Sequence, residues 1–161
     1  MTKKKVSAND SAVDLRSLIA KNMKNIEEYC KEHSLKLTPV RRKVFELLLE
    51  EKRGLGAYRI LDLLREAGFK SQPPVAYRAL EFLVENGFAH KIGSQNSFVA
   101  CTMPGEHHAP VFMICKKCDS VSEAPSSPSV SDLSHSLMEV GFEVEQTRIE
   151  AEGICSSCAD R

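Results

Sequence analysis

The chain has 161 residues, enough for one medium domain or two small ones, and its 42% hydrophobic content excludes wholesale disorder. No run of 18 apolar residues occurs, which excludes a membrane-spanning helix, and no apolar segment follows the charged start Met-Thr-Lys-Lys-Lys, so we expect a cytoplasmic protein. Net charge is zero, but residues 1–98 hold 18 Lys/Arg against 12 Asp/Glu, and residues 99–161 hold 4 against 10. This separation of charge favours a nucleic-acid-binding half over a chance distribution of charged residues.

Four helices are expected behind a flexible basic tail at residues 1–12. In each helical segment, apolar residues recur every three or four positions, which is the period of a helix with one buried face. Thr38 and Pro39 mark the start of the second helix, since threonine can cap a helix and proline fits its first turn. Glycines mark the ends of the third and fourth helices. The expected helices cover residues 14–33, 39–54, 58–67 and 73–86.

The hydrophobic period changes after the fourth helix. Residues 88–92 and 97–101 are short β-compatible runs, and the four residues between them suit a hairpin turn. Helices followed by a β-hairpin give the winged helix–turn–helix pattern, in which the fourth helix would be the recognition helix. We therefore expect a winged-helix DNA-binding domain at residues 13–96 and a hinge at residues 97–103.

The remaining chain, residues 104–161, predicts a small dimerisation and zinc-binding domain. A strand is expected at residues 111–115, a loop at 124–131, a helix at 132–141 and a strand at 142–150. About 60 residues bury too little surface to be robust alone, so a zinc staple and a partner subunit would both help. The expected fold class is α+β, with an N-terminal winged helix–turn–helix domain and a small C-terminal α/β dimerisation domain.

Four of the six cysteines form two Cys-x-x-Cys pairs, Cys115 with Cys118 and Cys155 with Cys158. Each pair offers two thiolates from one tight turn, and together the pairs can make a tetrahedral four-sulfur zinc site. Disulfides are disfavoured in a reducing cytoplasm, and a full set of four ligands is typical of a structural site. Redox-active cysteine pairs are the alternative interpretation.

A second group of candidate ligands lies between the two halves, at His90, Cys101, His107, His108 and Glu123. If the hairpin turns symmetrically, His90 lies diagonally beside Cys101 on the same face of the hairpin. One sulfur, two nitrogens and a carboxylate would make a tetrahedral site that holds zinc more reversibly than four thiolates. In the alternative interpretation, His90 is a plain wing residue, Cys101 belongs to the core and the adjacent histidines lie in an exposed loop.

Several motifs, in order along the chain, resemble the ferric uptake regulator family. They are the helix opening Leu37–Arg42, the recognition-helix segment Gln72–Leu80, the wing Phe88–Lys91 and the two cysteine pairs. Iron-sensing members usually carry histidines six, five and three residues before the first paired cysteine, where this chain has Ala109, Pro110 and Phe112. The ligand set of the zinc uptake branch is matched instead, by His90, Cys101, His108 and Glu123, with His107 as an alternative to His108.

This resemblance implies a zinc-responsive repressor that binds palindromic operators of zinc-uptake genes as a homodimer with two Zn²⁺ per subunit. Zinc loading would close the hinge and orient two winged helices on one double-stranded DNA operator. The resemblance makes Tyr77 and Arg78 the recognition-helix contacts, with Tyr58 from the preceding helix. Phosphate contacts are expected from Arg41, Arg42 and Lys91. For each of these side chains, a solvated or packed surface role is the alternative.

Three other functions carry different expectations. An enzyme is disfavoured because the chain lacks the His-x-Glu motif of zinc deaminases, a glycine-rich phosphate loop and a nucleophile elbow. We therefore expect no small organic substrate. A zinc-stapled protein-binding adaptor would show no sequence-specific, salt-dependent DNA binding. A family member that senses iron, manganese or nickel would differ in the metal selectivity of its DNA binding.

Overall fold

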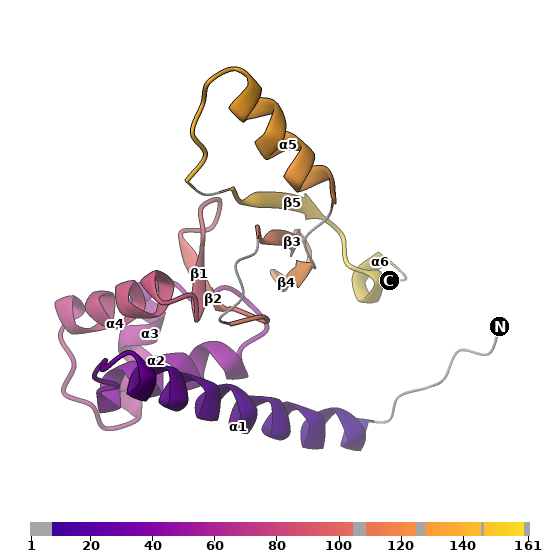
Figure 1. The fold of residues 1–161 in the computed structure, drawn as a ribbon. Coiled ribbons are helices and arrows are strands. Elements are labelled where there is room, and N and C mark those ends of the chain that lie inside the picture. The colour runs from indigo at the N-terminus through magenta and orange to yellow at the C-terminus, as the bar shows by residue number, and fades with distance from the viewer. Residues whose placement is uncertain (1–7, 105–108, 125–127, 146, 160–161) are drawn as a thin grey trace.

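The computed structural model describes residues 8–104, 109–124, 128–145 and 147–159, which form a helical unit and a smaller sheet unit (Figure 1). In the helical unit the elements are α1 (Ala8–Glu32), α2 (Pro39–Glu50), α3 (Ala57–Glu66), α4 (Pro73–Glu85), β1 (Ala89–Ile92) and β2 (Ser97–Ala100). The hairpin of β1 and β2 lies between the helices and the sheet. None of the helices in the described part of the chain has the length and apolarity that crossing a membrane requires.

The four helices pack around one apolar core, as the sequence predicts. Its largest fully buried side chains include Ile26, Val44, Phe45, Ile60, Leu64, Leu80, Leu83 and Phe88. The predicted start of α2 is confirmed, because the hydroxyl of Thr38 accepts a hydrogen bond from the Arg41 amide at 3.3 Å and Pro39 lies in the first turn. The packing of α2 against α4 fixes the orientation of the expected recognition helix.

The first helix begins earlier than the sequence predicts. It starts at Ala8, so residues 8–12 of the expected tail are helical. The segment between Ala8 and Asp14 contains no proline or glycine, and nothing in it stops the helix from extending toward the N-terminus. Residues 1–7 lie outside the described residues.

The wing hairpin has the expected register. His90 pairs with Val99, and the amide of Cys101 donates to the carbonyl of Phe88 at 2.9 Å. His90 and Cys101 are therefore diagonal neighbours on one face. The expected hinge at residues 97–103 is corrected at its start, because β2 occupies residues 97–100 and pairs with the whole of β1. The connection to the second unit begins after this strand.

The sheet unit has three strands in the order β4-β3-β5. Its elements are β3 (Val111–Cys115), β4 (Val121–Ala124), α5 (Pro128–Glu139), β5 (Ile149–Gly153) and α6 (Ser156–Ala159). β3 pairs antiparallel with β4 and parallel with β5. A parallel pair needs a long crossover, and the segment that contains α5 provides it.

Two expectations for this unit need correction. The strand expected at residues 142–150 is wrong over most of its length, since β5 begins at Ile149. All five residues of β3 already pair with Ile149–Gly153, so no partner is left for the earlier residues. The expected loop at residues 124–131 is too long, because Ala124 ends β4 and α5 already begins at Pro128, a residue that suits a first helical turn.

The wing also packs against the sheet unit. Ile92, at the end of β1, is buried together with Phe112 and Ile114 of β3. The segment after α2 contacts the sheet unit as well. There, the carbonyl of Lys52 accepts a hydrogen bond from the amide of Val121 at 3.0 Å. These contacts bring β1, β3 and β4 together, and the candidate metal ligands lie on these elements and at their ends.

Candidate metal centres and DNA-binding face

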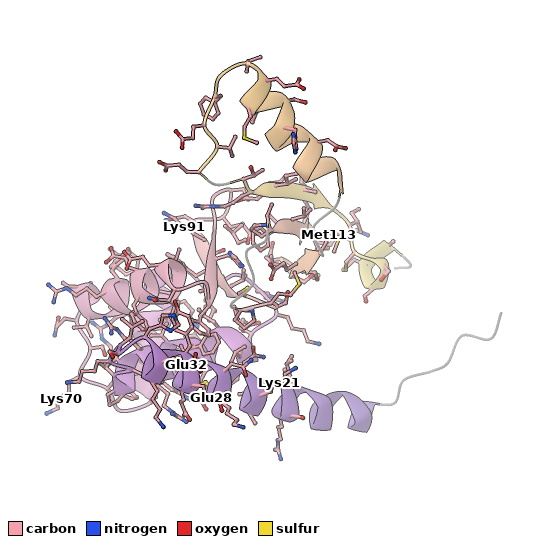
Figure 2. All side chains as sticks on the ribbon, in the orientation of Figure 1. Lys21, Glu28, Glu32, Lys70, Lys91 and Met113 are labelled. Atoms are coloured by element: carbon pink, nitrogen blue, oxygen red, sulfur yellow. The ribbon has the colours of Figure 1, made fainter. Side chains whose placement is uncertain are left out.

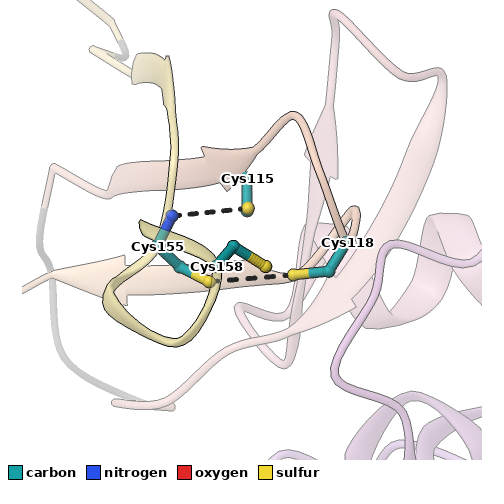
Figure 3. A group of neighbouring side chains, drawn as sticks. All are labelled: Cys115, Cys118, Cys155 and Cys158. Carbon is teal, nitrogen blue, oxygen red and sulfur yellow. Dashed lines mark hydrogen bonds between the residues drawn. The ribbon is translucent and has the colours of Figure 1, made fainter. Parts of the chain in front are cut away.

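Four cysteine side chains converge at one end of the sheet unit (Figure 3). Cys115 ends β3 and Cys118 lies in the turn that follows, while Cys155 immediately precedes α6 and Cys158 lies within it. The four sulfur atoms all lie within 4.8 Å of one another. The sulfurs of Cys118 and Cys155 are 3.8 Å apart. Zinc–sulfur bonds of about 2.3 Å in a tetrahedron require a separation of about 3.8 Å, so the cluster fits zinc.

The protonation chemistry of this cluster also fits a metal. Hydrogen bonds from the backbone amides of Cys155 and Cys118 lower the pKa of Cys115 to about 6. The neighbouring thiols of Cys155 and Cys118 raise the pKa of Cys158 to about 12. The Cys115 thiolate therefore forms readily, whereas Cys158 resists ionisation unless a cation offsets the charge around it. A divalent ion bound here would supply that compensating charge, and all four sulfurs could then act as ligands.

The second cluster joins the wing to the sheet unit. His90 lies on β1, Cys101 follows β2 and Glu123 lies on β4, and their ligand atoms all lie within 4.8 Å of one another. The Nε2 atom of His90 is 3.5 Å from Oε1 of Glu123. Cys101 is 1% exposed, and the side chains of His90 and Glu123 are 12% and 2% exposed. The structure thus brings together three of the predicted regulatory ligands.

The carboxylate of Glu123 is held in place by Thr102. The amide and the hydroxyl of Thr102 both donate to Oε2 of Glu123 at 2.8 Å, which leaves Oε1 directed at His90. Burial alone would raise the pKa of Glu123, but the hydrogen bonds from His90 and Thr102 outweigh it and lower the pKa to about 2. A buried, ionised carboxylate beside an imidazole and a thiol is a donor set that suits zinc.

The fourth predicted ligand, His108, and its alternative, His107, lie outside the described residues. The described chain breaks after Pro104 and resumes at Ala109, next to β3. The identity of the fourth ligand therefore stays a prediction.

The candidate DNA-binding side chains differ in how freely they face solvent. Tyr58 on α3 is 73% exposed and Tyr77 on α4 is 42% exposed, and both line a cavity of about 430 Å³ between the helices and the wing. Arg78 is exposed on α4. Lys91 points outward from the wing and lines the same cavity (Figure 2). These four side chains are available for a partner.

Arg41 and Arg42 are engaged within the helical unit. The guanidinium of Arg41 lies 3.8 Å over the ring of Phe82 and donates to the carbonyl of Lys36. Arg42 forms an ion pair with Glu27 of α1. The geometry therefore favours a packing role for Arg41, and phosphate contact by these two arginines stays a prediction.

Comparisons with known proteins agree with this arrangement. The model of the ferric uptake regulator family matches residues 32–152. The chain belongs to the ferric uptake regulator family. Over 136 residues it is 39% identical to the zinc uptake regulation protein of Escherichia coli strain K12. The matched region covers 83% of this chain and 79% of that protein. The family expected from the sequence motifs is confirmed.

Solved structures of family members show which arrangement of units this chain resembles. A zinc uptake regulator complexed with zinc and DNA superposes with a TM-score of 0.83 at 36% identity, over 88% of this chain and 95% of that one. Holo XcZur superposes with a TM-score of 0.79 at 38% identity, over 86% and 97%. Apo XcZur gives only 0.53 at 36% identity, over 89% and 99%. The arrangement described here is therefore similar to the holo form of that family member.

Two functional features have no direct signal in the sequence. Thr102 orients Glu123 although the two are 21 residues apart, and only the fold brings them together. Phe112 contacts the imidazole of His90, with ring centroids 5.3 Å apart and the ring planes tilted by 58°. In the sequence, Phe112 only marks a position where iron-sensing members carry histidine. In this structure its buried ring forms part of the apolar surroundings of the candidate site.

Proposed function

We propose that this chain is a zinc-responsive transcriptional repressor, which binds palindromic operators of zinc-uptake genes as a zinc-loaded homodimer in the cytoplasm. The observation that carries the proposal is the meeting of His90, Cys101 and Glu123, which belong to the wing, to the connection and to the sheet unit. A metal bound by all three would fix the wing relative to the sheet. Likeness to zinc uptake regulation proteins supports zinc over iron, manganese or nickel.

The two clusters support a proposed content of two zinc ions per subunit. Cys115, Cys118, Cys155 and Cys158 would hold a structural ion that joins the turn after β3 to α6. A regulatory ion would be held by the second cluster, with His108 or His107 as the fourth ligand. Four thiolates bind zinc more permanently than a mixed set, so the two sites would fill at different free zinc concentrations.

The regulatory mechanism is a shift between arrangements of the two units. The imidazole of His90, the thiolate of Cys101 and the carboxylate of Glu123 would hold zinc, whose divalent charge would stabilise their convergence at one point. His90 then anchors β1 and Glu123 anchors β4, while Thr102 holds the carboxylate in position. Such an ion stabilises the operator-competent arrangement only by its higher affinity for that arrangement. The hinge would consist of residues 101–103, after the end of β2.

A homodimer is supported by apolar surface on the sheet unit. Met138, Val140 and Phe142, at and after the end of α5, are 55%, 79% and 59% exposed. Met113 on β3 is 49% exposed. Apolar side chains gathered on one small unit favour burial against a second copy. A two-fold dimer would present two α4 helices to the two halves of a palindromic site.

The function is tested by measuring how a fluorescent palindromic promoter duplex binds in buffers with fixed free zinc, iron(II), manganese or nickel. We expect binding only as free zinc rises, with affinity that falls steeply as salt increases because phosphate contacts release counterions. Binding that ignores zinc, or that iron supports equally well, would contradict the proposal. Absence of sequence-specific binding under every metal would favour the adaptor function instead.

Replacing Arg78 with alanine should weaken operator binding about 5- to 150-fold, the range for loss of a bidentate base contact. Discrimination between the operator and a scrambled duplex should fall with it. Lys70→Ala is the control, since Lys70 is exposed just before α4, and it should change affinity by no more than about twofold. Fluorescence anisotropy at saturating zinc measures both. An equal loss on both duplexes would show that Arg78 contacts phosphate only.

A further inference from the structure

A carboxylate of the sheet unit binds the tip of the wing. Glu150 is the second residue of β5, and its Oε1 and Oε2 atoms accept hydrogen bonds from the amides of Gly93 and Ser94 at 2.7 and 3.0 Å. Gly93 and Ser94 lie in the turn between β1 and β2. In Figure 1 the tip of this hairpin lies beside β5. The contact therefore joins the two units through residues 56 and 57 positions apart.

The chemistry of this contact makes it directional and charge-assisted. Successive backbone amides of a turn form a small concavity that suits an anion, and an ionised carboxylate supplies one acceptor oxygen for each amide. Hydrogen bonds from Ser94, and then from Gly93, lower the pKa of Glu150, so the side chain is ionised at neutral pH. A Cβ built on Gly93 would lie 3.4 Å from Oε1 of Glu150, so the turn approaches the carboxylate closely.

The position of the contact allows it to restrict the orientation of the wing. Three contacts follow one another along the wing. His90, near the start of β1, belongs to the candidate metal cluster, and Ile92, at the end of β1, packs into the sheet unit. The turn after β1 then donates hydrogen bonds to Glu150. A single attachment at the metal cluster would leave the wing free to pivot about that point. Together with the packing of Ile92, an attachment at the tip removes the pivot, because separated points of contact define the direction of the hairpin.

We propose that Glu150 is a positioning residue for operator binding, which locks the wing tip to β5 in the zinc-loaded arrangement. This inference rests on the proposed zinc-dependent repressor function. Within the described part of the chain, Glu150 hydrogen-bonds the wing turn and neither a metal ligand nor an expected DNA contact, so it acts through the orientation of the wing. Because contacts that favour one arrangement are linked, removal of this one raises the free zinc needed for operator binding.

The test compares Glu150→Gln and Glu150→Ala with the matched control Glu152→Gln. Glu152 lies two residues further along β5 and pairs with Lys116 of its own unit at 2.9 Å, away from the wing. We expect the free zinc at half-maximal operator binding to rise about fivefold for Glu150→Gln and further for Glu150→Ala, in the lower range of coupling between sites. Glutamine retains one acceptor oxygen, which explains the graded effect.

A second readout separates positioning from general destabilisation. In zinc-loaded protein labelled with ¹⁵N-glycine and ¹⁵N-serine, the amides of Gly93 and Ser94 should exchange faster with solvent in both Glu150 variants and stay unchanged in Glu152→Gln. Unchanged exchange at both amides, or an unchanged zinc midpoint despite faster exchange, would overturn the proposal. If wild type binds the operator without zinc, the repressor function fails, and weaker operator binding by the variants still decides the role of Glu150.

Discussion

Replacing Cys115 with serine is expected to remove the structural metal and unfold the sheet unit. Structural zinc contributes about 10–16 kcal/mol of apparent binding free energy in small zinc-dependent folds. The sheet unit is small and buries little apolar surface, so it has few other sources of stability. Among the residues that the structure describes, its buried cluster consists of Phe112, Ile114 and, from the wing, Ile92, with Val99 and Val121 packed against it. Loss of β3, β4 and β5 pairing would also abolish dimerisation. Thermal unfolding, size-exclusion chromatography and zinc content per subunit measure these effects together.

Cys30→Ser is the matched control for this substitution. Cys30 and Cys115 are each 3% exposed, but Cys30 lies in the core of the helical unit, far in sequence from the cluster. A hydroxyl in that core should cost about 1–3 kcal/mol of stability without changing zinc content or dimerisation. A Cys115→Ser protein that keeps its full zinc content and its dimer would show that the cysteine cluster is not a structural metal site.

Replacing Cys101 with serine should abolish the zinc response while the protein stays folded. The substitution removes the only sulfur ligand of the second cluster, so the remaining ligands hold zinc weakly. Operator affinity at micromolar free zinc should fall about 10- to 100-fold, toward that of the metal-free protein. An anisotropy titration in zinc buffers measures the loss, and zinc content should decrease by one ion per subunit.

Glu123→Gln provides an independent change in the same cluster. Glutamine can still accept the hydrogen bonds from Thr102 but carries no charge, so it should weaken zinc binding with little change of shape. Cys30→Ser again serves as the control for a buried thiol. If Cys101→Ser and Glu123→Gln both bind the operator with the wild-type zinc midpoint, the second cluster plays no part in regulation.

Local signals in the sequence predicted the helical unit and the wing well. Thr38 and Pro39 mark the start of α2 by capping chemistry, and the spacing of apolar residues identifies the core face of each helix. The symmetric turn at residues 93–96 sets the hairpin register, which places His90 diagonally to Cys101. The paired cysteines could be recognised because two ligands from one turn are a local feature.

The missed strand β4 and the wrong bounds of β5 depend on contacts between distant segments, whereas the early starts of α1 and α5 are local features. The bounds of β5 follow from the length of its partner β3. The sequence of residues 142–150 carries no information about that length. β4 has the sequence Val-Ser-Glu-Ala and becomes a strand because the chain reverses at Asp119, whose φ is 57°, and returns beside β3. The roles of Thr102 and Glu150 likewise exist only once the two units meet.

The most direct test of the central claim is to measure the zinc affinity of the second site with and without operator DNA. If zinc at His90, Cys101 and Glu123 sets the arrangement that binds the operator, zinc binding and operator binding must be coupled reciprocally. Saturating operator should then raise the zinc affinity of that site by the same factor by which zinc raises operator affinity. Zinc affinity that is identical with and without the operator would contradict the account.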